Sequence, residues 1–161
     1  MEIYILRHGI AEDGQAGHPD ADRALTAEGK KKLRTVLRTA AKAGVAPTLI
    51  LTSPYRRALQ TAEIAAEVLD YKGDLLRTKA LQPGSEPRAV WEEIRVHKDE
   101  ANILLTGHEP LFSRLTAYLL ASPNLAVDFK KGAMACVDFD RFPAEPHGVL
   151  RWMLTPKLAG G

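Results

Sequence analysis

Glu2-Ile3-Tyr4-Ile5-Leu6-Arg7-His8-Gly9 is the stretch from which the fold class can be worked out. After Glu2 the run is apolar and rich in residues that favour strands, which is typical of a strand covered on both faces. It stops abruptly at Arg7. The pattern therefore predicts a buried strand that delivers Arg7 and His8 at its carboxyl end.

Helical and strand-like segments alternate after this strand. Residues 10–24 look like a loop, and Thr26 can cap a helix that ends before Gly44. The apolar positions expected on its buried face are Leu33, Val36, Leu37, Ala40 and Ala41. A second strand, 48–52, leads to Ser53-Pro54, which we interpret as a helix cap followed by proline at the first helical position. The buried stripe of that second helix is expected to be Ala58, Thr61, Ala62, Ala65 and Leu69.

The rest of the chain continues the alternation and then changes. A weaker strand over 75–80 precedes a short helix with Ser85 as its cap. A buried strand over 102–106 precedes a helix that carries Leu111, Leu115 and Leu119. Two strand-like runs, 134–139 and 149–154, are joined by residues 143–148 and are expected to form a hairpin or near-hairpin. This order predicts a layered α/β fold with a mainly parallel sheet, one edge of which is closed by the last strands.

Composition limits the classes of protein to be considered. At 161 residues, the chain fits a single domain, 1–161. Its 22 Lys and Arg nearly balance 20 Asp and Glu, so no overall field favours nucleic acid or an anionic membrane, and any anion site must be local.

Cysteine usage and the absence of targeting signals suggest a compartment. Cys136 is the only cysteine, which excludes an internal disulfide and a zinc site built on paired thiolates. The N-terminal residues lack the features of a secretory signal, and no segment has the roughly 20 apolar residues of a membrane span. We expect a cytoplasmic protein without metal or other cofactor.

Polar residues follow three of the predicted strands. They are Arg7-His8-Gly9, Ser53-Pro54-Tyr55-Arg56-Arg57 and Gly107-His108. Ligands of open parallel sheets bind at the carboxyl ends of the strands, so two imidazoles and at least two guanidiniums should converge there. An arginine guanidinium can donate two parallel hydrogen bonds to a pair of phosphate oxygens. An imidazole flanked by arginines resists protonation, which keeps a nucleophilic nitrogen free. This set suits a phosphoryl group, although periodicity alone does not choose between the two arginines after Tyr55.

These motifs resemble the histidine phosphatase (phosphoglycerate mutase-like) superfamily. The resemblance rests on Arg7-His8-Gly9, on 53–62 and on Gly107-His108-Glu109-Pro110, and it extends from end to end of the chain. In its short length, its Leu25-Thr26 helix start and its Leu81-Gln82-Pro83-Gly84 stretch, the chain is most similar to the SixA-type phosphohistidine phosphatases. The resemblance implies a three-layer α/β/α sandwich with a mainly parallel central sheet. It also implies that His8 is the nucleophile and that Arg7, Arg57 and His108 clamp the phosphoryl oxygens; Arg57 is chosen because it directly precedes Ala58 in the Arg-Ala-x-x-Thr element.

One departure from the wider superfamily concerns the substrate. Many members carry a mid-chain glutamate that protonates the leaving oxygen, and Gln82-Pro83-Gly84 has none in that context. An alkoxide leaving group needs such an acid, whereas a phosphohistidine ring can be protonated by solvent. We therefore expect a phosphohistidine-bearing signalling protein, such as a histidine phosphotransfer domain, as partner. The alternatives are a small-molecule phosphomonoesterase and a catalytically idle domain that binds phosphorylated proteins.

Other reactive residue types are interpreted as structural or solvated. Cys136 is expected to be a buried structural thiol. The residues expected at the surface are His18, His97, His147 and Arg56. Four acidic residues in the loop after His8 could reach the pocket but are expected in solvent: Glu12, Asp13, Asp20 and Asp22.

Overall fold

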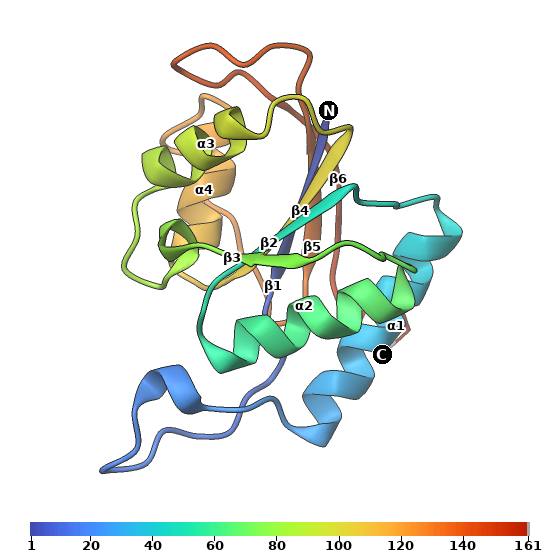
Figure 1. The fold of residues 1–161 in the computed structure, drawn as a ribbon, viewed down its shortest axis with the longest axis vertical. Helices are drawn as coiled ribbons and strands as arrows, with labels where there is room; N and C mark the ends of the chain where they lie inside the picture. The colour runs from blue at the N-terminus through green and yellow to red at the C-terminus, as the bar shows by residue number, and fades with distance from the viewer. Residues whose placement is uncertain (161) are drawn as a thin grey trace.

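The computed structural model describes residues 1–160, which form a six-stranded sheet with two helices on each face (Figure 1). In chain order the elements are β1 (Glu2–Arg7), α1 (Ala27–Lys42), β2 (Leu49–Thr52), α2 (Arg56–Val68), β3 (Leu75–Arg77), α3 (Pro87–Val96), β4 (Asn102–Gly107), α4 (Leu111–Leu119), β5 (Met134–Asp138) and β6 (Val149–Leu154). Short 3₁₀ turns lie at Asp20–Asp22 and Lys79–Leu81.

The sheet is mainly parallel, as predicted. Its strand order is β3-β2-β4-β1-β5-β6, and the first four of these strands are parallel to one another. β5 pairs antiparallel with β1, and β6 pairs antiparallel with β5, so the last two strands close one edge. The expected hairpin and the expected edge are both confirmed.

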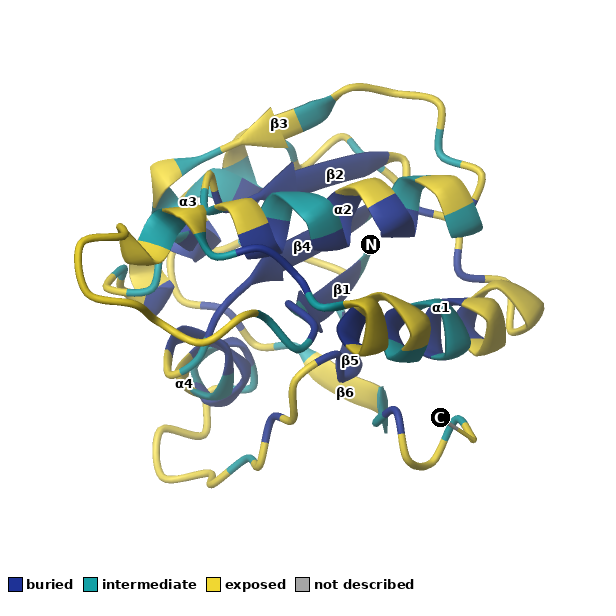
Figure 2. Ribbon diagram, turned by 90° about the horizontal axis from the view of Figure 1, so that it is seen from below, coloured by how far each residue is buried: buried dark blue, intermediate teal, exposed yellow. Residues whose placement is uncertain are grey.

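Successive side chains of each strand point to opposite faces of the sheet, which divides the core into two halves. Ile3 and Ile5 of β1 face a cluster with Trp91 of α3 and Leu115 of α4. Tyr4 and Leu6, one position along the strand, face the other cluster, which contains residues of α1 and α2. Seen end-on in Figure 2, the buried strands lie between these two helix pairs. The fold is the three-layer phosphoglycerate mutase-like sandwich.

Helix α1 shows how local sequence sets an element. The hydroxyl oxygen of Thr26 accepts a hydrogen bond from the Gly29 N–H at 3.0 Å, which caps the helix as predicted. Gly44 follows the helix with φ +88°, a left-handed conformation that favours glycine. The expected buried face is correct except at Ala41, which is exposed because it lies one residue beyond the stripe that meets the sheet.

Two predicted helix starts and one strand length are wrong. Helix α2 begins at Arg56 with Tyr55 as its N-cap, because the hydroxyl of Ser53 is engaged instead with the Tyr55 N–H and with a histidine of the neighbouring strand. Ser85 does not cap α3; its hydroxyl donates to the Lys79 carbonyl, and Glu86 is the N-cap residue. The strand expected over 75–80 stops at Arg77, where the chain turns into a 3₁₀ turn.

Candidate active site

The three polar motifs converge because their strands are neighbours. β1 pairs with β4 in a register that sets Arg7 opposite Gly107, and β4 pairs with β2 so that Thr52 lies opposite Thr106. The ladder continues past the strand ends, where the His8 N–H donates to the Gly107 carbonyl at 2.9 Å. The residues after each strand are therefore held at one edge of the sheet, as predicted.

His8 is buried, with 6% of its surface exposed, and its ring is held in one tautomer. Its Nδ1 lies 2.7 Å from the carbonyl oxygen of Gly9. A carbonyl can only accept a hydrogen bond, so Nδ1 carries the hydrogen and Nε2 presents its lone pair, which accepts a long hydrogen bond from Nε of Arg57 at 3.4 Å. Burial, assisted by the positive charges of Arg57 and Arg7 and opposed by the Gly9 hydrogen bond, lowers the pKa of His8 to about 4. The ring is neutral at physiological pH.

Arg57 lies beside this lone pair. Its Nε lies 3.4 Å from Nε2 of His8, and its guanidinium is only 4% exposed. The two terminal nitrogens bind Asp20, one to the backbone carbonyl at 2.8 Å and one to the carboxylate at 3.1 Å. Arg56 is exposed and reaches only the Asp22 carbonyl at 3.5 Å, so the structure places Arg57, and not Arg56, in the site.

His108 faces His8 across the pocket, with 5.2 Å between the ring centroids. Its Nε2 lies 2.8 Å from the Ser53 hydroxyl, and Tyr55 packs edge-on against the ring at 5.2 Å. Burial, assisted by the neighbouring charges of His8 and Arg57, lowers the pKa of His108 to about 3. Both imidazoles of the site are therefore neutral.

Two polar atoms at this site have no partner. Among the buried side-chain nitrogen and oxygen atoms of residues 1–160, only Nε of Arg7 and Nδ1 of His108 lack a hydrogen bond. Arg7 donates through a terminal nitrogen to the Phe129 carbonyl at 2.7 Å, which fixes its position. Unpaired buried polar atoms cost free energy, and the N–H of Arg7 Nε can only donate, so an acceptor such as a phosphoryl oxygen fits this site.

Comparison with known proteins agrees with this geometry. The family model described as histidine phosphatase superfamily (branch 1) matches residues 3–82, which contain the first two motifs. The chain belongs to the histidine phosphatase superfamily. An uncharacterized protein of Picosynechococcus is 36% identical over 68% of this chain and 67% of its own length.

A curated relative and a solved structure, both named SixA, cover nearly the whole chain. The phosphohistidine phosphatase SixA of Escherichia coli is 27% identical over 97% of this chain and 94% of its own. A structure of the protein histidine phosphatase SixA complexed with tungstate superposes with a TM-score of 0.87 at 27% identity, over 98% of each chain. This histidine phosphatase is thus a phosphatase of SixA-like fold.

The sequence did not single out three residues that shape the site of this histidine phosphatase. Asp20 is the one loop carboxylate that binds Arg57. Burial raises its pKa, but the hydrogen bonds and positive charges of Arg23 and Arg57 together hold it below its ordinary value. Ser53 and Tyr55 contact His108. Ser53 and Tyr55 belong to the sequence motif 53–57. Their contact with His108 could not be predicted, because it depends on β2 lying next to β4.

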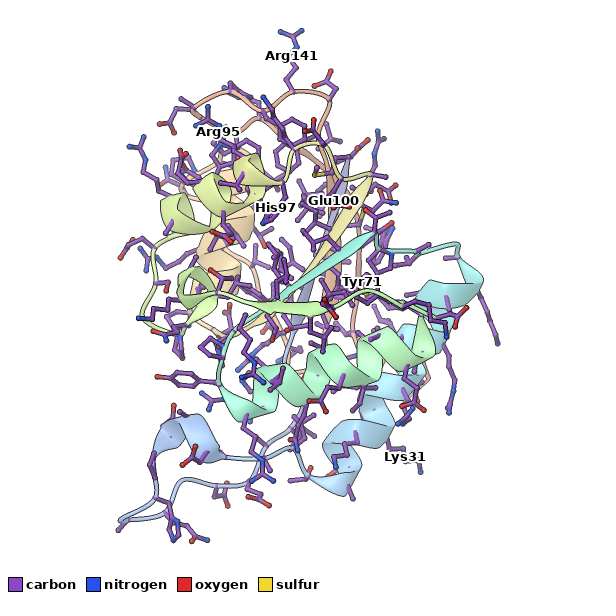
Figure 3. The ribbon with its side chains drawn as sticks, in the orientation of Figure 1. Lys31, Tyr71, Arg95, His97, Glu100 and Arg141 are labelled. Carbon is purple, nitrogen blue, oxygen red and sulfur yellow. The ribbon has the colours of Figure 1, made fainter. Side chains whose placement is uncertain are left out.

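The remaining candidates lie outside the pocket. Cys136 is a free, fully buried thiol on β5, and burial raises its pKa to about 12, which fits a structural role. His18 and His147 are exposed, and His97, the C-cap residue of α3, is half-buried (Figure 3). Residues 1–160 contain no group of three or more His, Cys, Asp or Glu side chains that could hold a metal ion. No helix in this part of the chain is long and apolar enough to cross a membrane.

Proposed function

We propose that this chain hydrolyses phosphohistidine on cytoplasmic signalling proteins through a covalent phospho-His8 intermediate, without a metal ion. The observation that carries the proposal is the lone pair on Nε2 of His8, held in place by the Gly9 carbonyl and flanked by Arg57. The unpaired nitrogens of Arg7 and His108 supply donors for the same phosphoryl group. A module that only binds phosphate would not need a nucleophile fixed in this way.

The reaction takes two steps. In the first, Nε2 of His8 forms a bond to phosphorus while the P–N bond of the substrate breaks, and the leaving imidazole takes a proton from solvent. In the second, water attacks the phosphorus, the bond to Nε2 breaks, and phosphate and a proton are released. The low pKa of His8 keeps its nucleophile unprotonated before the first step.

The clamp residues stabilise charge that spreads over the equatorial oxygens of the transferring group. A guanidinium has five N–H donors. Arg57 directs three of them at His8 and Asp20, which leaves two for phosphoryl oxygens and fixes the plane of the group. When Ser53 donates its hydroxyl proton to Nε2 of His108, Nδ1 of that ring carries the hydrogen and becomes a further donor.

The choice of phosphohistidine rests on the leaving group. Glu86, the carboxylate nearest in sequence to the Gln82-Pro83-Gly84 turn, binds Arg114 at 2.7 Å on the surface. Glu109, next to His108, accepts a hydrogen bond from the Ser113 N–H. Both carboxylates are committed elsewhere, which supports a substrate that needs no positioned acid. The relative of Escherichia coli carries the name phosphohistidine phosphatase, which also supports it.

The test measures phosphate release, with EDTA present, from a histidine phosphotransfer domain phosphorylated on histidine. An aryl phosphate is assayed in parallel. We expect release that persists in EDTA, exceeds the rate on the aryl ester, and is lost in His8→Ala. His147→Ala, a histidine on the exposed far loop, is the matched control and should behave as wild type.

Trapping distinguishes the mechanism from the substrate. A radiolabelled phosphoryl group should appear on the wild-type chain as an acid-labile, base-stable adduct, and not on His8→Ala. Cleavage of the aryl ester alone would overturn the phosphohistidine assignment and favour a small-molecule phosphomonoesterase. Binding of the phosphorylated domain without cleavage of either substrate would favour the idle binding domain.

A further inference from the structure

A basic groove opens beside the phosphoryl pocket. It encloses about 580 Å³ between the start of α1, the segment 130–131 and the segment 155–157. Figures 1 and 2 agree in placing the end of the chain beside α1. The groove is lined by Arg7, Ile10, Lys32, Lys130, Lys131, Thr155, Pro156 and Lys157. Five of these eight side chains are cationic, and none is acidic.

The lysines of the groove differ in how far they are neutralised. Lys32 pairs with Glu28 at 3.1 Å, and Lys130 pairs with Asp128 at 3.0 Å. Within residues 1–160, Lys131 and Lys157 have no ion pair, and both are exposed. A chain whose net charge is only +2 thus concentrates uncompensated positive charge in one hollow.

The groove and the reacting centre share one residue. Arg7 lines the groove and also belongs to the phosphoryl site. Lys131 precedes Gly132, whose N–H donates to the His8 carbonyl at 3.0 Å, so the lysine follows the backbone that supports the nucleophile. A molecule whose phosphoryl group lies on His8 therefore has its flanking surface over this groove.

We propose that the groove docks the acidic surface that surrounds the phosphohistidine of a protein substrate. This inference rests on the proposed function and extends it to the recognition of the partner. Ile10 and Pro156 give the groove an apolar part between its lysines, which suits a protein face that combines apolar and acidic side chains. The lysines steer encounter and orient the partner, so they act on association and not on the chemical step.

The experiment reverses the two unpaired charges. Lys131→Glu/Lys157→Glu is compared with Lys42→Glu/Lys98→Glu, which changes the net charge by the same amount, from +2 to −2. Lys98 is exposed and lies between His97 and Glu100, which Figure 3 labels far from Lys31, the neighbour of the groove residue Lys32. Kinetics are measured with an acidic histidine phosphotransfer domain phosphorylated on histidine and with an aryl phosphate, across a range of salt concentrations. A neutralising pair, Lys131→Gln/Lys157→Gln, separates loss of attraction from added repulsion.

We expect kcat/KM on the phosphoprotein to fall about tenfold at low salt in the groove variant, through KM, while the aryl phosphate reaction stays unchanged. The glutamine pair should fall by less, and salt should remove most of the difference. Equal losses on both substrates, or equal losses in the Lys42/Lys98 control, would overturn the proposal.

A binding measurement keeps the two proposals distinguishable. Fluorescence anisotropy follows binding of the unphosphorylated phosphotransfer domain, which requires no turnover. Weaker binding to the groove variant than to the Lys42/Lys98 control supports docking even where the wild type fails to cleave the phosphorylated domain. Equal binding to both variants refutes docking, whatever the catalytic result.

Discussion

Replacing Arg57 by lysine tests the clamp while keeping the positive charge of the pocket. Arg57 reaches His8 at 3.4 Å and Asp20 at 2.8 and 3.1 Å, and two of its donors remain for the phosphoryl group. A lysine ammonium concentrates its three donors at one point. It cannot hold Asp20, lie beside His8 and bind two phosphoryl oxygens at once.

The expected loss of kcat follows from the hydrogen-bond donors that Arg57 directs at the charge developing on the phosphoryl oxygens in the transition state. Removing one such preorganised donor typically lowers kcat by about 10²–10³-fold, or about 3–4 kcal/mol of transition-state stabilisation. We expect Arg57→Lys to fall in this range. Because lysine remains cationic, the pKa of His8 should stay low, and the change should appear in kcat and not in the pH at which activity is lost.

The assay is steady-state phosphate release from an aryl phosphate, which does not depend on the identity of the protein substrate. Arg56→Lys is the matched control, since Arg56 is adjacent in sequence but exposed. Thermal unfolding of each variant shows whether the buried site still folds. A folded Arg57→Lys enzyme within threefold of wild type, or an equal loss in Arg56→Lys, would refute the assignment of the clamp to Arg57.

Three further predictions concern the buried histidines and the packing beneath them. The acid limb of kcat/KM should lie near pH 4, as the pKa of His8 requires, and Arg57→Gln should move it upward because a lowering charge is removed. The folded pKa values of His8 and His108 lie below the unfolded value of about 6.5, so the unfolded chain binds more protons than the folded chain as pH falls below 6.5. The free energy of unfolding, measured with urea, should therefore fall by about 2 kcal/mol per histidine by about pH 5. His8→Asn should remove about half of the combined loss. Gly29→Ala should lower the free energy of unfolding by about 1–3 kcal/mol in the same assay, because the added methyl would overlap the Ile10 carbonyl. Unchanged stability would contradict this, because it would mean that the loop after His8 moves to make room for the methyl at no cost.

The spacing of apolar residues predicted the helices and strands well wherever one regular face of the element is buried. The stripe of α2 that contains Ala58, Ala62 and Ala65 is buried as expected, because a helix that covers a sheet must turn one face toward it. The same reasoning placed the polar residues of β1, β2 and β4 at one edge. That the chain forms one domain, and that His8 is the nucleophile, stay predictions.

Contacts between distant residues explain what the sequence could not predict. Ser53 has the composition of a helix cap, but its hydroxyl contacts His108, fifty-five positions along the chain, so the helix begins later. Likewise, four acidic residues of the loop 10–24 look equivalent in sequence. Only the path of that loop brings Asp20, and not its neighbours, to the guanidinium of Arg57. Neither contact can be predicted from the local preferences of the residues involved.

Two threonines at the carboxyl ends of β2 and β4 explain how loops that differ in sequence meet with the accuracy that phosphoryl transfer needs. Thr106 of β4 donates its hydroxyl to that of Thr52 of β2 at 2.7 Å, and Thr52 donates onward to the Ser53 carbonyl at 2.9 Å. Both threonines are fully buried at the point where the strands end and the motifs begin. Paired buried hydroxyls resist any slip between the strands, since a slip would leave each of them without a partner. The relative position of Ser53 and His108 is thus set by the sheet and not by the loops, which is the arrangement that a preorganised site requires.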